Sequence, residues 1–186
     1  MPLKIWEGGL SIYGGILGGI VAVLVYSAYK KQNFFNVTDV IAPTLILGQA
    51  IGRWGNFVNQ EVYGFEITNK AWQWFPVGVK IKDAFGNVSW HLANFFYESV
   101  LDLAGFFILL AILRKSKEKG IVTFAYVFYY GFIRIFLEFL REDAYILRVP
   151  GTNIPASALV SGLFIASGLA GFIYIIIKNK LKQKKS

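Results

Sequence analysis

Long apolar runs alternate with short polar segments along most of the chain. A helix that crosses about 30 Å of hydrocarbon needs roughly 20 mostly apolar residues. Four runs have about that length, and a fifth is short unless it continues into the polar residues that follow it. The pattern therefore predicts five membrane spans, at about 10–29, 37–51, 95–113, 121–139 and 154–177.

One segment, 57–92, interrupts this alternation. It contains Trp72, Trp74 and Pro76, and then a turn signal at Gly86 followed by Asn87. These features predict a small, partly β-structured excursion outside the membrane. The expected fold is thus an all-α polytopic helical bundle, with residues 1–186 forming one membrane domain and 57–92 an extracytoplasmic excursion within it.

Basic residues indicate the orientation. Eleven of the nineteen lysines and arginines follow the first, third and fifth spans. Since cytoplasmic loops are rich in lysine and arginine, residues 30–34, 114–119 and 178–186 are predicted to be cytoplasmic, and 57–92 and 142–153 external. The N-terminus would then be external without a cleavable signal, which also fits a chain that lacks an even number of upstream helices.

Composition narrows the class of protein. Hydrophobic residues make up 55% of the chain, which is too many for an ordinary soluble domain. There is no cysteine, so this chain offers no disulfide, thiolate zinc site or cysteine nucleophile, and its single histidine argues against a multi-histidine metal site. The net charge of +8 is explained by the cytoplasmic loops, and the basic tail has no aromatic residues between its lysines. We therefore expect no nucleic-acid partner.

Glycines punctuate the first span at GxxxG spacing, as Gly14 with Gly18 and Gly15 with Gly19. This spacing lets two membrane helices approach closely, and it predicts a helix-packing face.

The most polar stretch near a span is "GRWGNFVNQEVYG", at 52–64. If the second helix continues into it, Gln49, Arg53, Asn56 and Gln60 share one face. An arginine there either anchors the end of the span by snorkelling or lines a polar pocket. The density of amides beside Arg53 favours the pocket.

The fourth span ends in a second polar pattern, in which Arg134, Glu138 and Arg141 share one face. Arg134 lies too far inside the apolar run to snorkel easily. An intramembrane ion pair with a surplus guanidinium suits an anion such as a phosphate. The alternative is a structural pair within the helix.

The third span begins with two carboxylates four residues apart, Glu98 and Asp102. We expect both to pair with arginines of neighbouring helices rather than to catalyse a reaction. His91, just before this span, is expected to be a solvated or capping residue.

Three segments of the sequence resemble segments of one known protein family. "GRWGNFVNQEVYG" matches every fixed position of the signature G-R-x-G-N-F-x-N-x-E-x-x-G. "WEGGLSIYGGILGG" is similar to a glycine-rich helix, and "YGFIRIFLEFLRED" to an arginine helix, of the same proteins. In this order, and over nearly the whole chain, they resemble the prolipoprotein diacylglyceryl transferase family.

The resemblance implies a multi-pass transferase of the bacterial plasma membrane. Such enzymes move the diacylglyceryl group of phosphatidylglycerol onto the lipobox cysteine of a prelipoprotein signal peptide, forming a thioether and releasing glycerol-1-phosphate. The expected partners are these two substrates and membrane lipids, and no metal or organic cofactor is implied. The implied catalytic residues are Arg53, Arg134 and Tyr13. The implied substrate-binding residues are Arg53, Asn56, Asn59, Glu61, Gly64, Glu138 and Arg141.

The chain departs from the family in two positions and in length. Many members have histidine where this chain has Tyr13, and tyrosine is a poor base at neutral pH. Leu92 and Ala93 stand where the family has a histidine–proline pair. The family has seven spans, so the match begins at what would be the third, and the chain is expected to lack the first two.

Two other classes remain open from the residues alone. An anion channel or transporter would also line its path with arginines, although no internal repeat of the kind common in transporters is evident. A non-catalytic lipid-binding fragment is the third reading.

Overall fold

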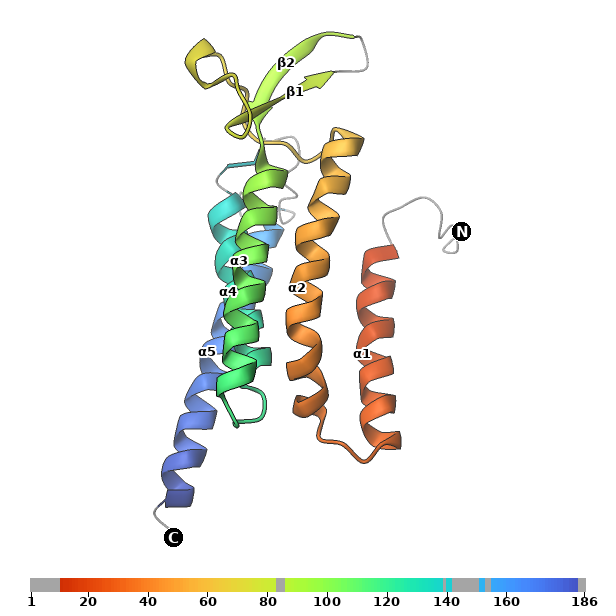
Figure 1. The fold of residues 1–186 in the computed structure, drawn as a ribbon, viewed down its shortest axis with the longest axis vertical. Coiled ribbons are helices and arrows are strands. Elements are labelled where there is room, and N and C mark those ends of the chain that lie inside the picture. The colour runs from red at the N-terminus through yellow and green to blue at the C-terminus, as the bar shows by residue number, and fades with distance from the viewer. Residues whose placement is uncertain (1–10, 83–85, 139, 142–150, 153–154, 184–186) are drawn as a thin grey trace.

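A computed structural model describes residues 11–82, 86–138, 140–141, 151–152 and 155–183. Within them the chain forms five α-helices and one β-hairpin (Figure 1). The helices are α1 (Ser11–Tyr29), α2 (Phe34–Asn59), α3 (Asn94–Lys115), α4 (Ile121–Glu138) and α5 (Ala156–Gln183); between α2 and α3 lie the 3-10 turn η2 (Lys70–Trp72) and the strands β1 (Gly78–Lys82) and β2 (Val88–Leu92).

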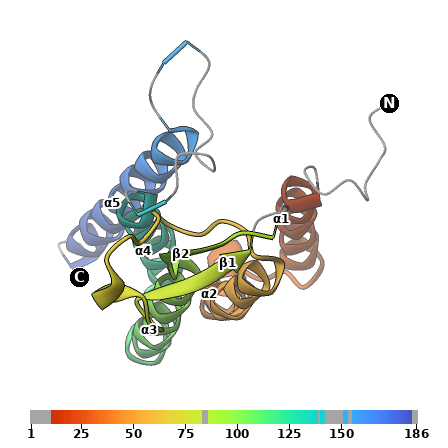
Figure 2. The same cartoon turned by 90° about the horizontal axis from the view of Figure 1, so that it is seen from above.

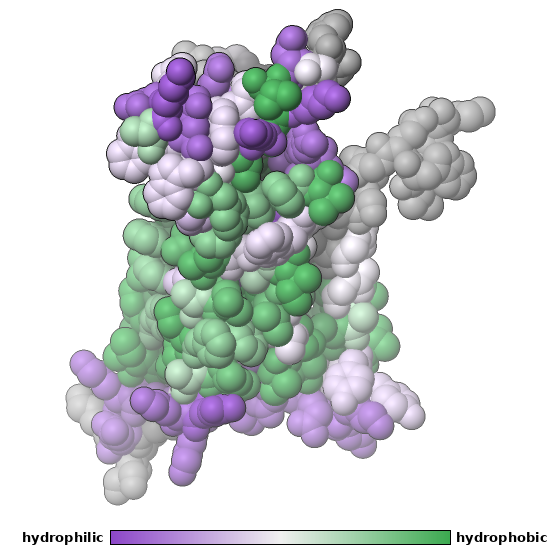
Figure 3. Space-filling model, turned by 45° about the horizontal axis from the view of Figure 1, so that its top comes forward, coloured by the Kyte–Doolittle hydropathy of each residue, from purple (hydrophilic) through white to green (hydrophobic). Residues whose placement is uncertain are grey.

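The helices run side by side and carry a broad apolar surface. Four of them, α2 to α5, are long and apolar enough to cross a membrane, and α1 adds a shorter apolar stretch, Leu17–Tyr29. Their outward side chains remain exposed, as expected where lipid covers them; Leu163 is 69% and Phe107 60% exposed. A hydrophobic band therefore lies between two hydrophilic ends (Figure 3). The prediction of a polytopic helical membrane protein is confirmed.

Helix α2 is longer than the predicted span of 37–51. Asn33 begins it by accepting a hydrogen bond from the Phe35 amide. The helix then continues without interruption through Gly52 and Gly55, and it ends only where Gln60 takes a left-handed conformation with φ 51°. The excursion consequently starts after Asn59 rather than at residue 57, and Arg53 lies within the helix instead of at its end.

The core lies between α2, α3 and α4, where Ile46, Leu109 and Val122 are almost fully buried. A buried carboxylate ties two helices at one end of this core. Asp39 of α2 accepts hydrogen bonds from the amides of Gly120 and Thr123, at 2.6 and 2.8 Å, and so caps the start of α4. Asp39 stands inside an apolar run of the sequence, where an aspartate signals a buried hydrogen-bond partner.

Close helix packing occurs at glycines other than those predicted. A Cβ placed on any of the four glycines of the first span, Gly14, Gly15, Gly18 and Gly19, would meet no atom within 4 Å. The GxxxG prediction is therefore wrong for the contacts within the described chain. Instead Gly131 of α4 lies against the Ser161 carbonyl of α5, while Gly171 of α5 lies against the ring of Phe124.

The excursion is partly β-structured, as predicted. Strands β1 and β2 pair antiparallel, with Gly78 opposite Leu92 and Lys82 opposite Val88. Residues 64–67 run along the other side of β2, where the Ile67 amide donates to the Trp90 carbonyl at 2.6 Å. The hairpin lies over the ends of α2 and α3 (Figures 1 and 2). That this end faces the outside of the cell stays a prediction.

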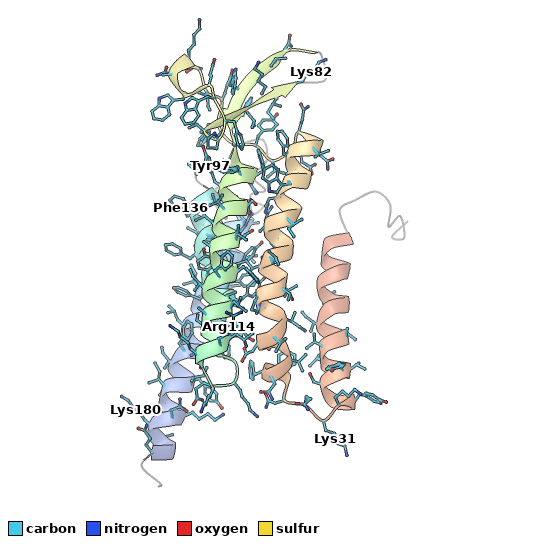
Figure 4. The ribbon with its side chains drawn as sticks, in the orientation of Figure 1. Lys31, Lys82, Tyr97, Arg114, Phe136 and Lys180 are labelled. Carbon is cyan, nitrogen blue, oxygen red and sulfur yellow. The ribbon has the colours of Figure 1, made fainter. Side chains whose placement is uncertain are left out.

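The orientation can be tested because the chain has no cysteine of its own. Lys31, Arg114 and Lys180 lie toward the end opposite the hairpin residue Lys82 (Figure 4). Cysteines introduced singly at Ser116 and Asn87 are therefore expected to react with a membrane-impermeant maleimide from opposite sides of the membrane. Reaction of both from the same side would contradict the five-span arrangement.

Candidate active site

Two arginines from different helices meet at one buried glutamate. Arg53 of α2 places Nη2 2.7 Å from Oε1 of Glu98, and Arg134 of α4 places Nη1 3.0 Å from the same oxygen. Glu98 comes from α3 and is only 4% exposed. Helix α3 thus holds together two guanidiniums that would otherwise repel each other, which confirms the predicted pairing of Glu98 with arginines of neighbouring helices.

The cluster continues past the end of α4. Oε2 of Glu138 lies 3.8 Å from Nη2 of Arg134 and 3.8 Å from Nη1 of Arg141, which are distances of ion pairing rather than hydrogen bonding. Burial, and then the charge of Arg134, lower the pKa of Arg141 from its usual value. We use the name arginine cluster for Arg53, Glu98, Arg134, Glu138 and Arg141. Its three guanidiniums and two carboxylates leave one positive charge.

The end of α2 presents a more exposed group of polar side chains. The side-chain amides of Asn56 and Asn59 both donate to Oε1 of Glu61, at 3.1 and 3.3 Å. The chain then reverses sharply, and Val62 has φ 55°, a rare conformation for a β-branched residue. These polar groups therefore lie where α2 ends and the chain turns toward the hairpin.

Gly52 and Gly55 do not form that turn. Both are helical, and a Cβ on either would meet no atom within 4 Å. The reversal of the chain is made instead by Gln60 and Val62, which both have positive φ.

Gly64 is the glycine of the motif that the fold does require. A Cβ there would lie 2.5 Å from the Leu140 carbonyl oxygen and 2.7 Å from both Oδ1 of Asn94 and Cβ of Leu92. Gly64 also forms an isolated antiparallel bridge with Arg141. The missing side chain thus lets the motif, α3 and the end of the arginine cluster come together, which gives Gly64 a positioning role.

We expect Gly64→Ala to destabilise the protein by about 1–3 kcal/mol, the usual cost of overpacking a site that cannot relax. Gly48→Ala is the matched control, since Gly48 is helical and has open space around it. That substitution should be neutral or stabilising by up to about 1 kcal/mol. Thermal unfolding in detergent measures both, and equal midpoints for the two variants would contradict the role given to Gly64.

The structure separates the residues of the predicted polar face. Arg53 enters the arginine cluster, whereas Gln49 donates to the Tyr126 hydroxyl at 3.1 Å, and Gln60 accepts from the Lys82 amide at 2.9 Å. Asn56 turns to Glu61. The side chain of Tyr13 lies outside the described part of the structure, so its catalytic role stays a prediction.

Two neighbouring residues differ from expectation. Asp102 is fully buried, yet its carboxylate has no hydrogen-bond partner among the described residues, so the pairing predicted for it is wrong. His91 is neither solvated nor a cap. It is buried in β2, with Nδ1 2.9 Å from the Gly64 carbonyl oxygen and Nε2 2.9 Å from Oγ of Ser89. His91 therefore joins the excursion to the motif.

Aromatic packing between α2 and α3 fixes the position of Arg53 along α3. Phe57 stacks on Phe95 with ring centroids 4.7 Å apart, and Trp54 meets the same ring edge-on at 5.3 Å. Nε1 of Trp54 also donates to Oγ of Ser99 at 3.1 Å. The apolar positions of the motif thus press α2 onto α3, and this contact brings Arg53 to Glu98.

A family model described as prolipoprotein diacylglyceryl transferase matches residues 2–174. The chain belongs to this family. Among curated relatives, the phosphatidylglycerol–prolipoprotein diacylglyceryl transferase of Clostridium botulinum strain 657 is 42% identical over 173 residues, which are 93% of this chain and 67% of the relative. The enzyme of the same name from Listeria monocytogenes strain HCC23 is 36% identical over 181 residues, which are 95% of this chain and 62% of the relative. The chain therefore spans about two thirds of the length of these relatives.

Proposed function

We propose that the protein transfers the diacylglyceryl group of phosphatidylglycerol to the cysteine thiol of a prelipoprotein. The observation that carries the proposal is the sharing of Glu98 by Arg53 and Arg134, because it aims two guanidiniums at one place inside a membrane protein of this family. The lipid headgroup is anionic, and the arginine cluster has one unbalanced positive charge. Guanidinium is the side chain best suited to hold a phosphate by two parallel hydrogen bonds.

The chemistry of the transfer explains why charge is needed there. The substrate's thiol must lose its proton, since the thiolate is the nucleophile. Its sulfur attacks the carbon of the diacylglyceryl group that is bonded to the phosphate oxygen. A C–S bond forms there, and the bond between that carbon and the phosphate oxygen breaks. Glycerol-1-phosphate leaves with the electron pair of that bond. Negative charge thus grows on the phosphate oxygens in the transition state, where prepositioned guanidiniums in a low-dielectric site are most effective.

The remaining residues of the motif suit the other end of the headgroup. Asn56, Asn59 and Glu61 lie just beyond Arg53 along the chain, and they carry exposed or partly exposed amide and carboxylate groups. Such groups offer hydrogen bonds to the hydroxyls of the terminal glycerol. Glu138 lies between Arg134 and Arg141 at ion-pairing distance from both, and Glu138 and Arg141 would complete the headgroup site.

The same proposal implies a cellular location and a membrane orientation for the protein. The protein would reside in the bacterial plasma membrane, with the hairpin and the headgroup site on the outer side, because Lys31, Arg114 and Lys180 of the predicted cytoplasmic segments lie toward the other end (Figure 4). Its second substrate would be the lipobox cysteine of a signal peptide, which approaches from the same membrane. This chain has no cysteine, so the thiol nucleophile would come from the substrate.

A transfer assay separates the proposed enzyme from an anion channel or a lipid-binding scaffold. The full-length protein is incubated with phosphatidylglycerol vesicles and a lipobox peptide, and the peptide's mass is measured. We expect a mass increase of one diacylglyceryl group, and none for a peptide with serine in place of the cysteine. Anion leakage from the vesicles without peptide modification would favour a channel, and lipid binding alone would favour a scaffold.

A further inference from the structure

Four large aromatic side chains of the excursion are exposed within one short stretch. Phe65 is 45%, Trp72 55%, Trp74 51% and Phe75 52% exposed. We call these four residues the aromatic rim. So much exposed aromatic surface in a part of the protein that lies outside the helix bundle indicates a contact that the isolated chain does not show.

One end of the rim, at Phe75, lies where the membrane span of α3 begins. The ring of Phe75 meets that of Phe96 edge-on, with centroids 5.0 Å apart, and Phe96 is in the first turn of α3. One residue further along, the Tyr97 hydroxyl donates to the Val77 carbonyl at 2.6 Å. These two contacts hold the C-terminal end of the segment that carries the rim against the end of the span, while η2, which carries Trp72, lies farther from the bundle (Figure 1).

The rim is also continuous with the lipid-facing side of α3. Phe96, Val100, Leu103 and Phe107 follow one another at i, i+4, i+7 and i+11, so they form one stripe along the helix. Val100, Leu103 and Phe107 are 48%, 42% and 60% exposed. Phe75 therefore lies directly above a stripe that faces lipid. The hydrophobic band and the hydrophilic cap likewise meet at this end of the molecule (Figure 3).

We propose that the aromatic rim is embedded in the lipid headgroup layer at this end of the bundle. Tryptophan is enriched at membrane interfaces because its ring is apolar and its N–H group hydrogen-bonds to headgroups or water. Embedding covers the four exposed rings and fixes the height of the excursion, and hence of Gly64 and His91, above the arginine cluster. The proposal rests on membrane insertion alone and does not depend on the transfer activity.

A single spin label measures the depth of the rim. The cysteine-free chain allows Ala71→Cys, an exposed position inside η2 that keeps all four aromatic residues. The labelled protein is placed in phosphatidylglycerol–phosphatidylethanolamine vesicles, and its collisions with oxygen, which concentrates in lipid, and with a water-soluble nickel chelate are compared. Labels at Phe107 and Lys82 serve as references for lipid and for water.

We expect the oxygen-to-nickel collision ratio at residue 71 to be several-fold above that at Lys82 and below that at Phe107. Replacing Trp72 and Trp74 by serine should lower the ratio at residue 71 to the Lys82 value. Val88→Ser is the matched control, since Val88 is 59% exposed but belongs to the hairpin and not to the rim, and it should change nothing. A ratio equal to that of Lys82 in the unsubstituted rim would overturn the proposal and indicate a protein partner for this surface. An unchanged ratio after the tryptophan substitutions would also overturn it.

Discussion

Arg53→Ala is expected to lower kcat by at least about 100-fold, the effect commonly found when one group that stabilises transition-state charge is removed. The substitution deletes one of the two guanidiniums that meet at Glu98. Glu98 keeps Arg134 as its partner, so its buried charge is not left alone, and the protein should still insert and fold. Transfer is measured with phosphatidylglycerol and a lipobox peptide, and insertion is measured by fractionation of membranes.

Arg114→Ala is the control for this substitution. Arg114 lies in the last turn of α3, far from Glu98 along the same helix, and is exposed. Its loss should leave turnover within about twofold of the original, because exposed charges away from the site contribute little. Near-normal turnover of the Arg53 variant would remove this residue from the reaction.

Arg134→Lys should reduce turnover by at least about tenfold, although it keeps the positive charge. Lysine is a point charge on a flexible stem, whereas the planar guanidinium of Arg134 directs Nη1 to Glu98 and Nη2 toward Glu138. The lysine cannot hold both carboxylates and a phosphate in one plane. Rates at saturating lipid separate this loss from weaker binding, which would appear mainly in KM.

Glu138→Gln is the comparison within the same cluster. It removes one carboxylate 3.8 Å from Arg134 and keeps the size of the side chain. If Glu138 only orients the arginines, this variant should lose less activity than Arg134→Lys. A lysine variant as active as the original would mean that the site requires charge alone and not the guanidinium geometry.

The helices were more predictable from the sequence than the geometry of the candidate site. Apolar length and the spacing of Arg134 and Glu138 follow directly from helical periodicity, so these features were predictable. The extent of α2 was not, because the polar residues and glycines after Ile51 look like the end of a span. Arg53 is tolerated inside the helix because Glu98 of α3 pairs with it, and Phe95 of α3 packs against Phe57, four residues further along α2.

Contacts between distant segments were the least predictable. Nothing in the local sequence indicates that Gly64 must accommodate Leu140, Asn94 and Leu92, or that His91 reaches the Gly64 carbonyl. The same holds for helix packing, where glycine spacing pointed to the first span but close approach occurs between α4 and α5. Spacing specifies which residues share a face, whereas the neighbouring element decides whether that face is used.

Glu98 holds two arginines of the cluster in place by pairing with both. A carboxylate that touches two arginines keeps both in place before a lipid arrives, and each guanidinium retains further N–H groups for a phosphate. In the proposed reaction, the site would thereby be prepared for charge that develops only in the transition state, which is the condition for strong electrostatic stabilisation.

A structure of the full-length protein with phosphatidylglycerol bound tests this account most directly. The account predicts that Arg53 and Arg134 both place guanidinium nitrogens within hydrogen-bonding distance, about 3 Å, of oxygens of one phosphate, while Glu98 remains between the two side chains. A phosphate held by one of the arginines alone, or bound away from Glu98, would contradict it.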